Sequence, residues 1–295
     1  MSKFFLFSII FISSIVYGKE IALTFDDAPV GSSKHFESIA RTQELIAKLK
    51  ALEVQGAMIF ANPCKDEKNG IAQLKKYVEA GHFIGNHTCS HPRLDDVGFA
   101  SYSKDAKKGN QLLSSLFNGQ KFFRFPFLNE SKDEKLRDEM REWLKKNKYR
   151  NGMVSIDNDD YIFSWAINKA KDHGKKIDYP KVEKLFLEHL IGAVNFYDNL
   201  AVKTMGYSPK HVILLHEVDA TVMFVDALVK ELRSQGWKII SAEDAYKDKM
   251  YLEQPKNTYA NNGIIAQIAM EKTGEKIGYN HFDEIKAELN KILGL

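Results

Sequence analysis

The sequence predicts an α/β fold in which seven short parallel strands alternate with helices. The strand-like runs span residues 20–25, 56–61, 82–86, 121–125, 151–156, 211–215 and 237–240, and helical stretches separate them. Alternation of this kind is typical of parallel strands joined by crossover helices. The chain has 295 residues, enough for one α/β barrel, which takes roughly 250 residues.

The expected helices are marked by their apolar period and by the residues at their ends. Residues 39–52 carry Ile and Leu close to every 3.6 positions, and residues 71–80 form a second helix that Gly81 ends. The connection between the fifth and sixth strands is longer, and Pro180 stands near the start of an amphipathic helix within it. We interpret this connection as a crossover with an insertion. Residues 241–244 begin another helix, and residues 263–272 and 282–292 predict two more.

The first 18 residues are typical of a secretory signal peptide. Lys3 precedes a largely apolar run over residues 4–12, and small and polar residues follow it. The alternative is a membrane anchor, but the apolar run is shorter than the about 20 residues that a spanning helix needs. We therefore expect export of the chain and no stable membrane anchor.

The composition is that of a folded globular protein, with 44% hydrophobic and 27% charged residues. The 42 Lys and Arg nearly balance the 39 Asp and Glu, and the basic residues are scattered among acidic ones. Nucleic-acid binding requires a basic patch or stripe, and none is present in the pattern. Nucleic acid is therefore excluded as the expected partner.

Polar residues gather where the predicted strands end rather than where they begin. The residues at or just after these ends are Asp26, Asp27, His87, Arg124, Asp157 and His216. In a β/α barrel, the loops at the carboxyl ends of the strands converge on one face. We therefore expect these side chains to line a single cleft.

Two histidines and one aspartate have the composition of a catalytic metal site. His87 and His91 are four residues apart, so one helical turn would place both imidazoles on the same face. Because Pro92 disfavours a helical conformation at His91, we expect only a final turn there. Together with Asp27 the pair would leave one coordination position for water. Taken alone, two such histidines more often form a hydrogen-bonded surface pair, and two adjacent aspartates a solvated turn.

The neighbouring Asp26, Arg124 and His216 suggest proton chemistry. Adjacent residues of a strand point to opposite sides, so Asp26 and Asp27 can take different roles. A buried Arg124 would need a carboxylate partner, and Asp26 is the candidate, although a surface arginine in an aromatic loop is the alternative. His216 ends an apolar strand and can donate a proton near neutral pH, but a lone histidine there more often only packs.

Five segments, taken in order, resemble the motifs of the polysaccharide deacetylases of the fourth carbohydrate esterase family, which contain a NodB-type deacetylase domain. The segments are residues 24–27 (TFDD), 87–91 (HTCSH), 124–127 (RFPF), 157–161 (DNDDY) and 214–216 (LLH). Each motif alone is weak, but five in order are specific. The resemblance implies a distorted (β/α)7 barrel, with the insertion between strands 5 and 6 and the extra C-terminal helices as additions.

The resemblance also implies a role for each residue of these motifs. Asp26 would be the general base, and Asp27, His87 and His91 would bind a divalent metal, usually zinc. Arg124 would orient Asp26, and His216 would be the general acid. The backbone N–H of Phe127 would help bind the oxyanion, and Leu214 would form part of the pocket for the acetyl methyl group. Residues 19–250 would be the catalytic domain and residues 251–295 a helical extension packed on the barrel.

Three positions depart from the family pattern. Ala28 stands where glycine is common, and Phe127 replaces a frequent tyrosine. In the fourth motif Asp160 aligns with the aspartate that tunes the acid and Tyr161 with the usual tryptophan, for which the nearby Trp165 would compensate. Asp157 remains an alternative to Asp160. The only two cysteines, Cys64 and Cys89, follow neighbouring strands, and the sequence leaves open whether they pair.

The resemblance implies an exported, periplasmic or secreted enzyme that releases acetate from an amino-sugar polysaccharide. The leading substrate is the N-acetylglucosamine of peptidoglycan, and chitooligosaccharides and acetylated xylan are alternatives within the same chemistry. A non-catalytic carbohydrate-binding protein on the same barrel is a rival from another class. A pure binder has no need of both an acid and a base, so the intact motif set favours the enzyme. We expect a monomer.

Overall fold

The computed structural model describes residues 18–65 and 69–295, so the predicted signal peptide lies outside the described residues apart from Gly18. The strands are β1 (Glu20–Ala28), β2 (Met58–Ala61), β3 (Phe83–Asn86), β4 (Phe122–Phe123), β5 (Arg150–Asn151), β6 (His211–His216) and β7 (Lys238–Ile239). The α-helices are α1 (Ser38–Ala51), α2 (Gly70–Glu79), α3 (Leu94–Leu113), α4 (Glu134–Lys146), α5 (Asp160–Asp172), α6 (Tyr179–Met205), α7 (Asp219–Ser234), α8 (Ala242–Ala245), α9 (Gly263–Thr273) and α10 (Phe282–Leu293). Two 3-10 helices, η1 (Pro126–Leu128) and η2 (Lys249–Leu252), complete the elements.

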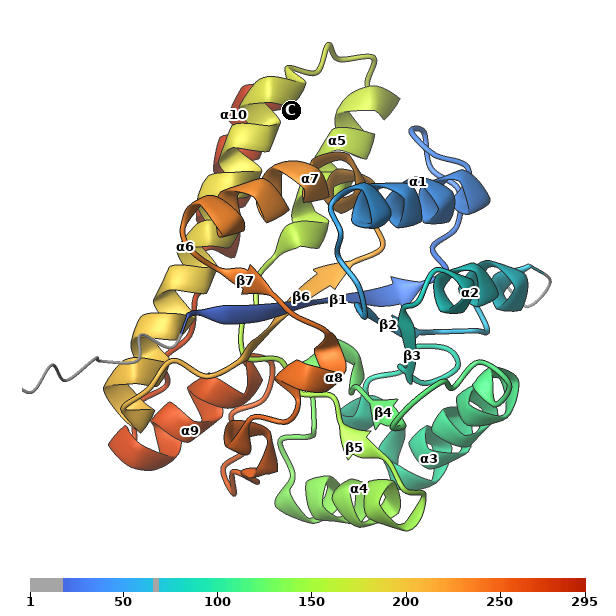
Figure 1. Ribbon diagram of the computed structural model, residues 1–295, viewed down its shortest axis with the longest axis vertical. Helices are drawn as coiled ribbons and strands as arrows, with labels where there is room; N and C mark the ends of the chain where they lie inside the picture. Colours follow the sequence, from blue (N-terminus) through green and yellow to red (C-terminus); the bar gives the residue numbers. More distant parts are fainter. Residues whose placement is uncertain (1–17, 66–68) are drawn as a thin grey trace, which may run out of the picture.

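All strand pairs of the sheet are parallel, in the order β5-β4-β3-β2-β1-β6, and β7 pairs with the first residues of β1. β1 is the central strand (Figure 1). Its consecutive residues Ile21, Ala22 and Leu23 are fully buried, as expected for a parallel strand that is covered on both faces. The structure therefore confirms the predicted α/β class and the seven strands.

The sheet curls into a distorted barrel that closes through irregular backbone. The predicted strand 121–125 is shorter in the structure, and the predicted strand 151–156 overlaps β5 only at Asn151, because the ladder between β4 and β5 ends at Gly152. The carbonyl of Gly152 accepts a hydrogen bond from the Arg124 side chain (2.7 Å) instead of from a neighbouring strand. The chain then reaches β6, where Ile156 forms an isolated bridge with Ile213. Side-chain chemistry thus interrupts the sheet beside the cleft.

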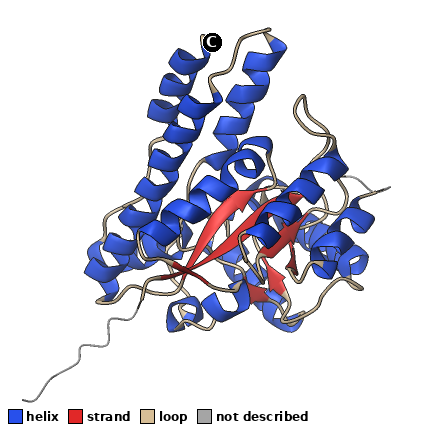
Figure 2. Ribbon diagram, turned by 45° about the horizontal axis from the view of Figure 1, so that its top comes forward, coloured by secondary structure: helices blue, strands red, loops and turns tan. Residues whose placement is uncertain are grey.

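Helices surround the sheet (Figure 2), and the longest of the described helices, α6 with 27 residues, lies in the connection between β5 and β6. This connection contains α5 and α6, which form the predicted insertion. The C-terminal helices pack on it: α9 contacts α6, and α10 contacts both α5 and α6 (Figure 1). The Ile264 N–H also donates to the Val154 carbonyl at 2.8 Å. The extension therefore contacts both the insertion and the irregular edge of the barrel.

One large apolar cluster joins both faces of the sheet to the helices and includes Leu45 of α1, Leu190 of α6, Val225 of α7 and Ile265 of α9. A smaller cluster lies under α3 and α4. Among the helices that the structure describes, none combines the length and the apolar character needed to span a bilayer.

Candidate active site

A cleft of about 480 Å³ opens at the carboxyl ends of the strands. Its walls come from β1, β6, the loops after β3, β4 and β5, and the C-terminal segment. The lining residues are Asp26, Asp27, His87, His91, Arg93, Phe127, Leu128, Asp157, Asn158, Asp159, Tyr161, Leu214, His216, Val218 and Asn261. The structure therefore brings most of the predicted site residues to one cavity, and places Arg124 and Asp160 directly behind its wall.

Asp26 and Asp27 reach the same cleft because a bulge interrupts β1. Asp26 pairs with Phe60 and Ala28 with Ala61, which leaves Asp27 as the extra residue, with a φ of 75°. A bulge re-aims the side chain that it contains. The expectation that strand alternation separates the two carboxylates is therefore wrong. They are distinguished by their partners instead.

The segment from His87 to His91 is a loop and contains no helical turn. Thr88 and His91 both have positive φ, of 67° and 62°, and Pro92 disfavours a helix at His91. Side chains hold the loop: Asp105 accepts hydrogen bonds from the N–H groups of Cys89 and Ser90 at 2.7 and 3.0 Å. The predicted turn is therefore wrong. The two imidazoles nevertheless lie close together, as the turn was expected to place them, with ring centroids 4.9 Å apart.

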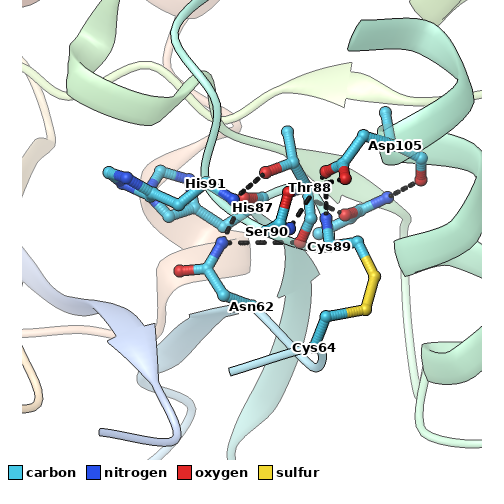
Figure 3. The surroundings of a disulfide bond; sticks show 10 residues. Asn62, Cys64, His87, Thr88, Cys89, Ser90, His91 and Asp105 are labelled. Carbon is cyan, nitrogen blue, oxygen red and sulfur yellow. Dashed lines mark hydrogen bonds between the residues drawn. A yellow bond between two sulfur atoms is a disulfide. The ribbon is translucent and has the colours of Figure 1, made fainter. Parts of the chain in front are cut away.

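A disulfide joins Cys64, after β2, to Cys89 between the two histidines, with the Cα atoms 5.0 Å apart (Figure 3). The sequence left this pairing open. Asn62 adds to the same connection, because its side-chain amide donates to the carbonyls of His87 and Thr88. The imidazoles of His87 and His91 lie side by side on the side of the loop away from the disulfide (Figure 3). The disulfide and Asn62 therefore fix the loop that carries both histidines.

Asp27, His87 and His91 fit a divalent metal ion. One ligand atom from each residue lies within 4.8 Å of the others. His87 Nδ1 donates to the Arg124 carbonyl at 2.8 Å, which leaves Nε2 as the lone-pair nitrogen facing the cluster. Such a hydrogen bond on the second ring nitrogen is usual for histidines that bind metals. Asp27 Oδ1 lies 3.3 Å from His91 Nε2 and 3.9 Å from His87 Nε2, so the three ligand atoms face one point.

The protonation states of these three residues also suit a metal. Burial lowers the pKa of His91 to about 4 and that of His87 well below its ordinary value. Both imidazoles are therefore neutral at neutral pH, as metal ligation requires. Burial by itself would raise the pKa of Asp27, but the positive charge of Lys65 opposes burial, and the pKa of Asp27 lies below its usual value. The Lys65 ammonium lies 3.0 Å from Asp27 Oδ1.

Arg124 is buried and every part of its guanidinium is engaged. Nη1 donates to Asp26 Oδ1 at 2.5 Å and to the Thr24 hydroxyl at 2.9 Å, and Nη2 donates to the Tyr246 hydroxyl at 3.0 Å. The structure thus places Arg124 against Asp26, the partner expected from the sequence. Burial raises the pKa of Asp26 to about 6, while Arg124 opposes this rise. Asp26 can therefore accept a proton near neutral pH.

His216 is paired with Asp160. The ring Nδ1 lies 2.6 Å from Asp160 Oδ1, and the His216 N–H and the Thr221 hydroxyl both donate to Oδ2. Burial by itself would lower the pKa of His216, but the charge and hydrogen bond of Asp160 raise it to about 9. Asp160, rather than Asp157, is therefore the carboxylate that contacts this ring. Asp157 lies in the cleft wall, where burial and the nearby Asp159 raise its pKa to about 8.

Phe127 and Leu214 border the space between these groups. Phe127 has a φ of 61°, and its ring packs between the His91 imidazole, 4.5 Å away, and the Arg93 guanidinium, 4.2 Å away. Leu214 precedes His216 by two positions and is almost fully buried. Both residues therefore lie where the sequence placed them, on the cleft wall beside the histidines.

Several residues of the site were not predicted from the sequence. Lys65 and Arg93 lie in loops without a motif, Tyr246 follows α8, and Asn261 enters the cleft from the C-terminal segment. The Asn261 N–H donates to the Leu128 carbonyl at 3.2 Å. No local pattern distinguishes these residues, because only the tertiary fold brings them to the cleft.

The fold is the distorted (β/α)7 barrel that is also found in solved carbohydrate esterases. A crystal structure of a pseudoenzyme of the fourth carbohydrate esterase family from Bacillus anthracis superposes with a TM-score of 0.53 at 18% identity, over 78% of this chain and 66% of that one. Residues 15–150 match the polysaccharide deacetylase family. The match over residues 15–150 identifies this part of the chain as resembling a polysaccharide deacetylase domain, in agreement with the resemblance seen in the sequence.

Curated relatives carry the same domain within longer proteins. A peptidoglycan-N-acetylglucosamine deacetylase of Bacillus cereus is 32% identical over 109 residues, which is 37% of this chain and 36% of the relative. The peptidoglycan-N-acetylglucosamine deacetylase PgdA of Listeria monocytogenes is 23% identical over 79% of this chain and 40% of its own length. The chain thus spans between a third and two fifths of the relatives that it matches.

Proposed function

We propose that this protein is an exported, metal-dependent deacetylase that removes N-acetyl groups from the N-acetylglucosamine of peptidoglycan and releases acetate. One observation carries the proposal. A proton acceptor, Asp26, and a proton donor, His216, face one cleft that also contains the cluster of Asp27, His87 and His91. The family includes pseudoenzymes, but this chain retains both proton-transferring groups.

Asp27, His87 and His91 would hold a divalent cation, most readily zinc, because two histidines and one carboxylate leave a coordination position open. The cation would supply Lewis acidity toward the acetamide carbonyl and its attacking water. Because both imidazoles are neutral and the Asp27 carboxylate is ionised, none of the three ligands has to lose a proton before it binds the cation.

The chain's own groups account for the proton transfers. Asp26, held by Arg124, takes a proton from the water as its oxygen bonds to the acetyl carbon. The Phe127 N–H would donate to the developing oxyanion, an interaction typically worth ~3 kcal/mol. His216 then gives its Nε2 proton to the departing nitrogen as the C–N bond breaks. The products are acetate and the free amino sugar.

Each group in the cleft has a protonation state that suits its step. Asp26 is ionised above a pKa of about 6, and His216 is protonated below about 9. Leu214, on the cleft wall beside His216, supports a pocket for the acetyl methyl group. The N-terminal 18 residues support export, and peptidoglycan lies outside the cytoplasmic membrane.

Acetate release from purified peptidoglycan, chitooligosaccharides and acetylated xylan tests the proposal. We expect release from peptidoglycan, and a fall of about 10²- to 10⁴-fold for Asp26→Asn and His216→Gln. Asp96→Asn, which alters an exposed carboxylate on α3, is the matched control and should retain full activity. Elemental analysis of the purified protein measures bound metal. Retention of metal with no acetate from any glycan would refute the enzyme and favour a carbohydrate-binding protein.

A further inference from the structure

Three large aromatic side chains stand exposed in a row beside the cleft. Tyr161 and Trp165 of α5 are each 43% exposed, and Phe282, the first residue of α10, is 37% exposed. Tyr161 and Trp165 are four residues apart and therefore share one face of α5. We call these three residues the aromatic stripe. Apolar side chains of this size, gathered at the surface, commonly mark a binding site.

The aromatic stripe is continuous with the catalytic cleft. Tyr161 lines the cleft, and its ring meets the His216 imidazole edge-on with centroids 5.5 Å apart. On its other side the ring centroid of Phe282 is 6.5 Å away. Since the C-terminal segment also places Asn261 in the cleft wall, the extension contributes to the site at two points.

Two lysines accompany the stripe away from the cleft. Lys286 of α10 lies 5.4 Å from the Trp165 ring centroid and 5.7 Å from that of Phe282. Lys169 of α5 lies 4.8 Å from the same Trp165 ring. Glu284, in the first turn of α10, is engaged by His281 at 2.6 Å. The outer end of the stripe therefore combines exposed ring edges and faces with two ammonium groups.

We propose that the aromatic stripe and its two lysines form a subsite for the sugar residues that flank the reacting one, and that this subsite prefers a glycan bearing carboxylates. The inference rests on the proposed function and deepens it. Pyranose rings present apolar C–H faces that pack on aromatic rings, while the lysines pair with carboxylates on the same polymer. Peptidoglycan, whose stem peptides carry free carboxylates, meets both requirements, whereas chitin meets only the first.

Steady-state kinetics with Trp165→Ala/Phe282→Ala tests the stacking part. We expect KM for peptidoglycan strands to rise about tenfold, equivalent to ~1.4 kcal/mol, with kcat retained and with little change on di-N-acetylchitobiose. Leu252→Ala, which removes an apolar side chain that is 71% exposed elsewhere, is the matched control. Trp165→Phe should restore most of the affinity. An unchanged KM on long strands would overturn the inference.

The charge preference is tested with Lys169→Gln/Lys286→Gln and the control Lys184→Gln on the exposed side of α6. The double variant should raise KM for peptidoglycan several-fold and leave KM for chitohexaose unchanged. Added salt should reduce the difference in KM for peptidoglycan between the variant and the wild type. Equal losses on both glycans would overturn the preference.

Binding without turnover separates this inference from the proposed function. In Asp26→Asn, the fluorescence of Trp165 should change on titration with peptidoglycan strands, and Trp165→Phe should abolish the change; the other tryptophans, Trp143 and Trp237, are less exposed. If the wild type releases no acetate but Asp26→Asn shows this fluorescence change, the proposed enzyme is refuted and the proposed subsite is supported. If sedimentation instead shows that the stripe variants dissociate a dimer while glycan binding is unchanged, the stripe contacts a second copy and the inference fails.

Discussion

Replacing Asp160 with asparagine should move the alkaline limit of activity toward neutral pH. In the structure the Asp160 carboxylate contacts the His216 ring at 2.6 Å, and neither residue is freely exposed. Asparagine keeps the size of the side chain but removes its charge. The perturbation therefore tests whether this carboxylate keeps His216 protonated.

The size of the effect follows from the opposing influences on His216. Burial lowers its pKa, and Asp160 is the largest influence that raises it, to about 9. Loss of an adjacent opposite charge typically shifts a pKa by about 1 to 3 units. If the pKa falls from about 9 to near 7, the protonated fraction at pH 8 falls from about nine tenths to about one tenth. Activity at pH 8 should then fall about tenfold, with a smaller loss at pH 6.

The pH dependence of kcat/KM, measured by acetate release between pH 5 and pH 10, reports this pKa in the free protein. Asp159→Asn is the matched control, because Asp159 directly precedes Asp160 but its carboxylate accepts a hydrogen bond from the Tyr161 hydroxyl. Asp159→Asn should leave the alkaline limb of the pH profile at the same pH as in the wild type. An alkaline limb that stays near pH 9 in Asp160→Asn would refute the assignment of His216 as the acid that Asp160 tunes.

The same pair contributes to stability with a defined sign. Because the folded-state pKa of His216 is raised to about 9, its contribution is fully present below the unfolded value near 6.5 and is lost as pH rises through about 9. The pH-dependent part of the difference in melting temperature between wild type and Asp160→Asn should therefore be largest near pH 6 and vanish above pH 10. Thermal unfolding followed by circular dichroism measures it.

Three further predictions concern the groups around the site. Lys65→Gln removes the ammonium that competes for the metal ligands, so zinc affinity, measured by competition with a chelator, should rise; unchanged affinity would show that the lysine withdraws freely. Tyr246→Phe leaves a buried Arg124 donor without its acceptor and should cost ~1 to 3 kcal/mol in denaturant unfolding, and a cost near zero would contradict the geometry. Cys64→Ser/Cys89→Ser opens a link between residues 25 apart and should cost ~3 kcal/mol and lower zinc affinity. Equal metal affinity in this variant would show that the loop needs no disulfide.

Much of the fold could be predicted from local pattern. The helices predicted over 39–52, 71–80, 263–272 and 282–292 differ from α1, α2, α9 and α10 by at most one residue at each end. The strand β6 and the carboxyl end of β3 also match closely. These segments have a strong apolar period or clear end signals, which depend only on neighbouring residues. The predicted strands 121–125 and 151–156 extend beyond β4 and β5, because the Arg124 side chain donates a hydrogen bond to the Gly152 carbonyl.

The candidate site was predicted in its composition but not in its local geometry. His87 and His91 converge through two left-handed residues and a loop held by Asp105, although the spacing suggested a helical turn. Asp27 reaches the cleft through a bulge, which strand alternation does not anticipate. In both places partners distant in the sequence fix the backbone, so local propensity could not reveal the conformation.

The sequence alone determined the parallel α/β class, the order of the five motifs and the identity of the candidate metal ligands, because strand ends and residue types are local properties. Only the tertiary structure decided that Asp160 pairs with His216 and that Cys64 and Cys89 are joined. It also decided that Lys65 contacts Asp27, that Tyr246 contacts Arg124 and that Asn261 lines the cleft. Such contacts join residues far apart along the chain. They form when burial of the core brings separate loops together, and no periodic pattern in the sequence predicts them.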